Sequence, residues 1–159
     1  MDRPRESSGE SSGLWAAAAV AAAAAPKEPP KPAVQFSVIE NRRLTPCENR
    51  GKHNIFIKIV DTAGNPVDGV TLVQVPAGTT GNVLDKTVSG TKGPGLAEFA
   101  MWKGGTYDVY ITADGVNPSN PEIARQMTSG LPDEANCSDG GGGNTLFHNS
   151  FNVIYRKNF

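Results

Sequence analysis

The two histidines of this chain, His53 and His148, are each followed directly by an asparagine. Each imidazole stands at the start of an apolar segment that reads as a strand, so the rings meet at one end of the fold if those strands are neighbours. Imidazole is a common metal ligand, but a protein site usually supplies three or four ligands. No third ligand lies at a recognisable spacing. We therefore expect a polar cluster at strand ends, with a metal site as the alternative.

Aromatic side chains offer a second kind of chemistry, the binding of sugars. Trp102 lies beside a glycine-containing turn at residues 103–105, and Tyr107 and Tyr110 follow in an expected strand. Aromatic rings stack on the apolar faces of sugars. Because Tyr107 and Tyr110 are three residues apart, they face opposite sides of a strand, and only one can join a flat platform. Trp102 and Tyr107 are the candidate ligand-binding residues; a tryptophan at the edge of the core is the alternative.

Cys47 and Cys137 are the two cysteines, and no CxxC spacing indicates a zinc site. Cys47 stands before the first strong strand and Cys137 before the last, so the thiols can meet if those strands are neighbours. We predict a disulfide bond, which would agree with an oxidising compartment. Two free thiols in a reducing cytosol are the alternative.

Short strands are the elements that must position these residues. Apolar alternation or high β-propensity marks residues 33–40, 54–60, 70–75, 83–88, 96–102, 106–113 and 146–155, and residues 122–128 read as a strand or one helical turn. Polar turns rich in glycine, asparagine and proline separate them, most clearly at residues 61–69. No amphipathic helix is apparent. The pattern predicts an all-β fold, an antiparallel two-layer sandwich of seven to eight strands over residues 33–159.

Residues 1–32 have a different composition. An apolar, alanine-rich run at 14–25 precedes a proline-rich stretch at 26–32. The run is shorter than the roughly 20 residues that span a bilayer, and its length suits the hydrophobic region of an export signal. An Ala/Pro-rich linker is the alternative. We expect no globular structure here, and contact with a membrane only through a transient export signal.

The overall charge narrows the function classes. Fifteen basic side chains nearly cancel sixteen acidic ones, for a net charge of −1, so there is no electrostatic reason to expect a nucleic acid partner. No nucleophile elbow, phosphate-binding loop or Ser/His/Asp arrangement is apparent. We therefore assign no catalytic residue and no cofactor.

Three segments resemble a known group of domains. Residues 61–70 (DTAGNPVDGV), 95–99 (GLAEF) and 105–109 (GTYDV) resemble the first hairpin and middle segment of prealbumin-like bacterial sandwich domains. That group includes the carboxypeptidase regulatory-like and collagen-adhesin B-type modules. The resemblance implies an Ig-like or prealbumin-like topology and says little about function. The flanks at 44–54 and 143–151 are similar to a C-terminal module of secreted bacterial proteins, which implies a role at the cell surface or beside a wall- or polysaccharide-acting enzyme.

The resemblance also implies a candidate isopeptide bond. In collagen-adhesin-like modules, a lysine on the first strand is joined to an asparagine on the last strand, with help from a buried carboxylate. Here Lys58, Asn152 and Glu98 match those roles. The reaction needs a neutral amine, which burial would favour. A solvent-facing lysine that protects a sheet edge or outer face is the alternative.

Together, these observations predict a non-catalytic, secreted or cell-surface interaction or structural module. Its expected partner is an extracellular glycan or a protein subunit. The strand at 33–40 could complete the sheet of a second copy, giving a homo-oligomer or polymer, or fold back on its own domain. The alternative is an accessory domain of a secreted hydrolase, or a metal-binding enzyme that uses His53 and His148.

Overall fold

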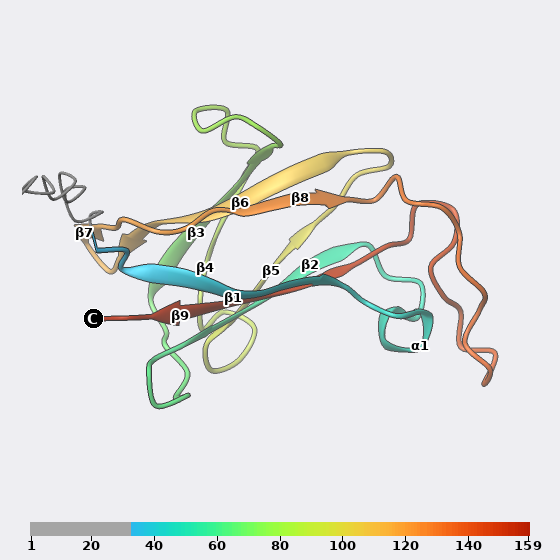
Figure 1. Ribbon diagram of the computed structural model, residues 1–159, viewed down its shortest axis with the longest axis horizontal. Helices are drawn as coiled ribbons and strands as arrows, with labels where there is room; N and C mark the ends of the chain where they lie inside the picture. The colour runs from blue at the N-terminus through green and yellow to red at the C-terminus, as the bar shows by residue number, and fades with distance from the viewer. Residues whose placement is uncertain (1–32) are drawn as a thin grey trace, which may run out of the picture. The chain divides into compact units, whose positions relative to one another are not determined.

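The computed structural model describes residues 33–159, which form two β-sheets facing each other (Figure 1). The first sheet has the order β1-β9-β2-β5, with β1 at Phe36–Arg43, β9 at Phe151–Lys157, β2 at Asn54–Val60 and β5 at Leu96–Ala100. The second has the order β4-β3-β6-β7, with β8 also on β6; the bounds are β4 Asp85–Val88, β3 Val70–Pro76, β6 Thr106–Asp114, β7 Asn117–Pro118 and β8 Ala124–Thr128. One short helix, α1, spans Pro46–Asn49. The predictions for residues 1–32 lie outside the described residues.

The predicted all-β, two-layer sandwich is confirmed, with differences in detail. The described part of the chain has nine strands rather than seven to eight, because residues 117–118, expected as a turn, pair with β6. The first sheet is mixed rather than purely antiparallel, because β2 and β9 run parallel. The last strand begins at Phe151 instead of residue 146.

The turn after β2 connects the two layers instead of closing a hairpin within one sheet. β2 belongs to the first sheet and β3 to the second. Asp61 shapes the turn, since its Oδ1 accepts the backbone N–H groups of Ala63 and Asn65, each at 2.8 Å. The turn prediction was correct, but the sequence did not show that the two flanking strands lie in different sheets.

Alternating side chains from both sheets fill the core. On β2, Ile55, Ile57 and Ile59 point inward and are buried, as the period of two predicts. Tyr155 of β9 is fully buried, and its hydroxyl donates to the carbonyl oxygen of Val109 on β6 at 2.6 Å, which ties the sheets together. Burial raises the pKa of Tyr155 above its ordinary value, so this hydroxyl remains a hydrogen-bond donor.

Strand β1 folds back on its own domain. It pairs antiparallel with β9, from Phe36 opposite Lys157 to Arg43 opposite Phe151. The Phe36 side chain is buried in the core, and its carbonyl oxygen accepts the N–H of Glu122 at 2.8 Å. The strand expected at residues 33–40 thus folds back on its own domain, and it begins three residues later than expected, at Phe36. Exchange of this strand between copies stays a prediction.

Candidate ligand-binding site

A cleft of about 270 Å³ lies at the end of the sandwich where β2 and β9 begin and β5 ends. The residues that line it are His53, Met101, Trp102, Lys103, Leu146, Phe147 and His148. The sheet topology explains why these distant segments meet. β2 and β9 are parallel neighbours, so their starts share an end, and β5 runs antiparallel to β2 and finishes there.

The structure brings the two histidines together in this cleft. The ring centroids of His53 and His148 are 5.6 Å apart, with an interplanar angle of 62°. Nδ1 of His148 lies 3.0 Å from the carbonyl oxygen of Thr145, which fixes the orientation of the ring. Within residues 33–159, no group of three or more His, Cys, Asp and Glu side chains could hold a metal ion. The described residues therefore supply only two side-chain ligands, His53 and His148, for the metal site considered as the alternative.

Trp102 and Tyr107 do not form the shared binding platform that was expected of them. The Trp102 side chain is 77% exposed on the rim of the cleft, whereas Tyr107 is 4% exposed and belongs to the core. The prediction that Tyr107 presents its ring to a ligand is therefore not met. Its hydroxyl instead accepts the backbone N–H of Trp102 at 3.0 Å, and Ser129 Oγ donates to the Trp102 carbonyl at 2.7 Å. These contacts fix the backbone that presents the indole.

The opposite loop contributes a turn within residues 146–155, which were expected to form a strand. Leu146 and Phe147 both have positive φ, 50° and 71°, and the N–H of His148 donates to the carbonyl of Thr145 at 2.9 Å. This sign pattern is that of a type I′ turn, which favours Asn-Gly because most other side chains are strained there. Leu146 is 73% exposed and Phe147 36%. The turn thus holds two apolar side chains at the surface in a strained conformation.

Contacts from outside the turn hold it in place. Asp133 Oδ1 accepts the N–H of Leu146 at 2.9 Å, and the buried Asn49 of α1 donates through Nδ2 to the carbonyl of His148 at 2.7 Å. The strain at Leu146 and Phe147 is therefore balanced by tertiary hydrogen bonds, not by local sequence preference.

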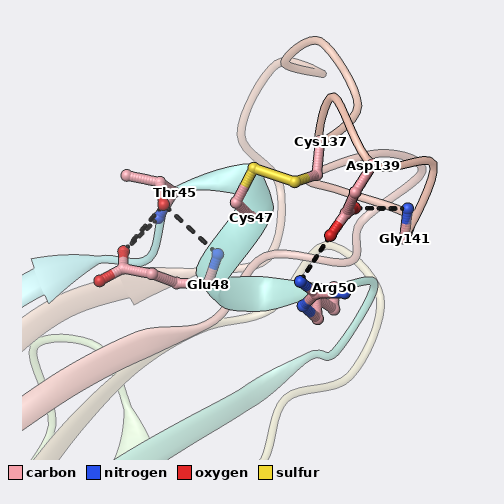
Figure 2. The surroundings of a disulfide bond; sticks show 7 residues. All are labelled: Thr45, Cys47, Glu48, Arg50, Cys137, Asp139 and Gly141. Carbon is pink, nitrogen blue, oxygen red and sulfur yellow. Dashed lines mark hydrogen bonds and ion pairs between the residues drawn. A yellow bond between two sulfur atoms is a disulfide. The ribbon is translucent and has the colours of Figure 1, made fainter.

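Helix α1 is attached covalently to the loop that carries this turn (Figure 2). Cys47 and Cys137 form the predicted disulfide, with their Cα atoms 4.7 Å apart. Beside it, Arg50 pairs with Asp139 at 2.7 Å, and the N–H of Gly141 donates to the same carboxylate at 2.9 Å (Figure 2). The Gly141 N–H and the Arg50 guanidinium lower the pKa of Asp139. The loop is thus held by one covalent and one ionic link.

A capping box begins the helix. Thr45 Oγ1 accepts the N–H of Glu48, and the Glu48 carboxylate accepts the N–H of Thr45 at 2.9 Å (Figure 2). Arg42 pairs with Glu48 at 2.8 Å. The bonds from Arg42 and then Thr45 lower the pKa of Glu48 to about 2, from an ordinary value of 4.5.

We expect acid to weaken this cap between pH 4.5 and pH 2. A carboxylate whose pKa is lower in the folded state stabilises the fold above its ordinary pKa, and that contribution is lost as the pH falls toward the folded value. NMR titration of the Glu48 carboxyl carbon should give a midpoint near pH 2, together with lower protection of the α1 amides against exchange, relative to their intrinsic rates at each pH. Glu48→Gln should remove the pH dependence of that protection. A Glu48 midpoint near 4.5 would contradict the cap.

The three isopeptide candidates lie away from the cleft, on the outer face of the first sheet. Glu98 and Asn152 are both in register with Phe56, so they flank it, and Lys58 lies two residues further along β2. The structure therefore brings the three onto one surface, where they line a shallow pocket.

The surroundings of Lys58, Glu98 and Asn152 differ from those that formation of an isopeptide bond needs. The Lys58 side chain is exposed, so its amine lacks the burial that favours a neutral form. Glu98 pairs with Lys92 at 2.7 Å, and Asn152 Nδ2 donates to Glu40 Oε1 at 2.6 Å. The isopeptide bond stays a prediction.

Fold and cleft together define a two-layer β-sandwich with an aromatic cleft at one end. No protein-family model matches the chain, and no curated protein matches it. Among solved structures, the C-terminal fragment of the pilus adhesin SpaC from Lactobacillus rhamnosus GG is a distant match, with a TM-score of 0.32 and 13% sequence identity. The match covers 67% of this chain and 46% of that fragment. The resemblance to prealbumin-like families stays a prediction.

Within residues 33–159, no helix is long and apolar enough to cross a membrane.

Proposed function

We propose that this chain is a non-catalytic extracellular interaction module that binds a glycan in the cleft beside Trp102. The observation that carries the proposal is the exposed Trp102 side chain on a backbone fixed by Tyr107 and Ser129. Two further exposed apolar side chains, Leu146 and Phe147, line the same cleft, and exposed apolar side chains that gather in one place are typical of a contact surface. An indole ring offers a flat apolar face on which a sugar stacks.

The rest of the cleft suits binding rather than hydrolysis. Its lining includes a second aromatic ring, Phe147, and two imidazoles able to hydrogen-bond with sugar hydroxyls. Glycosidases generally use a pair of carboxylates on either side of the scissile bond. No aspartate or glutamate is among the described residues that line the cleft, so its chemistry favours recognition without bond cleavage.

The disulfide supports an extracellular setting. Structural disulfides persist in oxidising compartments and are rare in reducing cytosol. The Cys47–Cys137 bond holds the loop that forms one wall of the cleft. A secreted or cell-surface location would therefore keep the proposed site intact.

Replacing Trp102 tests the proposal. We expect Trp102→Ala to weaken glycan binding about tenfold, because the stacking surface is lost, without changing stability. A glycan array with the full chain would first identify ligands, and calorimetry would compare affinities. Phe159→Ala is a matched control, since this aromatic side chain is 68% exposed and lines a different pocket. Failure to bind any glycan, or equal loss in both variants, would reject the proposal.

A further inference from the structure

We infer that the sugar bound beside Trp102 carries an anionic group, and that Lys103 selects it; this inference rests on the proposed function. Every ionisable side chain that lines the cleft is a base: Lys103, His53 and His148. A cleft whose described lining holds bases and no carboxylate is complementary to a negative charge.

Lys103 supplies the positive charge on which the inference depends. Its Nζ lies 4.9 Å from the centroid of the Phe147 ring, so the ammonium spans from the Trp102 loop to the opposite wall. Lys103 takes part in none of the ion pairs of residues 33–159, whereas Lys92 and Lys157 each pair with a carboxylate. Its positive charge is therefore available to a ligand.

Asp133, the carboxylate that is hydrogen-bonded to the turn at Leu146, forms no ion pair with Lys103. Asp133, which touches the loop opposite Lys103, uses its Oδ1 to accept the N–H of Leu146. Lys103 lines the same cleft as Trp102, so a sugar stacked on the indole shares that cleft with the ammonium group. An anionic substituent on that sugar then forms a charge-assisted contact that a neutral sugar lacks.

The histidines add hydrogen bonding on the other side of the cleft. The Thr145 carbonyl is an acceptor, so the contact with His148 Nδ1 assigns the ring proton to that nitrogen. Nε2 of His148 then remains for the ligand. Recognition thus combines stacking by Trp102, hydrogen bonding by imidazole and charge pairing by Lys103.

Matched oligosaccharides test the inference with the full chain. Calorimetry would compare a neutral oligosaccharide with one of the same length containing a uronic acid, and with its sulfated counterpart. We expect about fivefold tighter binding of at least one acidic form at low salt, decreasing as salt rises. Lys103→Gln should reduce the affinity for the acidic sugar to that for the neutral one. Lys86→Gln, which alters an exposed lysine outside the cleft, should have no effect.

The possible outcomes separate the two proposals. Equal affinity for neutral and acidic sugars, lost in Trp102→Ala, would overturn the inference and keep the proposed function. Acid-selective binding that Lys103→Gln leaves unchanged would overturn the role of Lys103. Absence of binding to every oligosaccharide would reject the proposed function itself. Preference for the uronate or the sulfate form would support the inference and identify the source of the charge.

Discussion

Loss of the Cys47–Cys137 disulfide, through the double substitution Cys47→Ser and Cys137→Ser, should lower the free energy of unfolding by about 4–5 kcal/mol. The bond joins residues 90 positions apart, and cross-linking so long a loop removes much of the conformational freedom of the unfolded chain. Denaturant unfolding of the oxidised protein and the double variant measures the difference. Replacing both cysteines avoids a free reactive thiol in the variant.

A matched variant separates the covalent link from its ionic neighbour. Arg50→Gln removes the pairing with Asp139 but keeps the disulfide; both side chains are about half exposed, so we expect a much smaller loss of stability than in the serine variant. The serine variant should also show faster amide exchange at residues 145–148, because the loop that carries the turn loses its anchor to α1. Equal stability of the oxidised protein and the serine variant would show that the disulfide does not support the fold.

The core could be predicted from the sequence because burial on a strand repeats every two residues. This rule puts Ile55, Ile57 and Ile59 on one face of β2, and the structure buries that face. The same rule applied strictly to Tyr107, Val109 and Ile111 predicts one face for all three, and the structure buries that face. The aromatic type of Tyr107 suggested contact with a ligand, whereas its position in the strand indicated the core, and position decides its burial.

Strand neighbours could not be predicted in the same way. Alternation describes which way a side chain points, but it carries no information on the direction of the strand beside it. The local sequence pattern therefore does not predict the parallel pairing of β2 with β9. That pairing places His53 and His148 at the same end of the sandwich. Their positions near the starts of two strands were visible in the sequence; the direction of pairing that joins them was not.

The turn at Leu146 and Phe147 was missed for a different physical reason. Phe147 has the same parity as Phe151, Val153 and Tyr155, so it matched a continuous strand. Leucine and phenylalanine have no local preference for positive φ. Contacts from Asp133 and Asn49, distant in sequence, impose the conformation. A sequence reading based on local preferences cannot identify a turn of this kind.

Replacing Leu146-Phe147 with Asn-Gly should make the protein more stable and a poorer binder. Asparagine and glycine adopt positive φ with little strain, so the double variant should gain about 1–2 kcal/mol, after allowance for the greater freedom of glycine when unfolded. Phe147 forms one wall of the cleft and lies against the ammonium of Lys103. Its removal should weaken binding by more than about tenfold. Denaturant unfolding and calorimetry with the preferred glycan measure the two effects.

A variant that is more stable but binds more weakly would show that the turn is retained for binding. A turn with no function would show no loss of binding. Leu146→Asn alone should keep the Phe147 ring and most of the affinity while relieving part of the strain. Leu84→Asn, at an exposed leucine outside the cleft, controls for loss of apolar surface. Unchanged binding in the double variant would exclude Phe147 from the site. Lower stability would mean that Leu146 and Phe147 are retained for packing, because the relief of backbone strain would then be smaller than the packing energy that the two side chains provide.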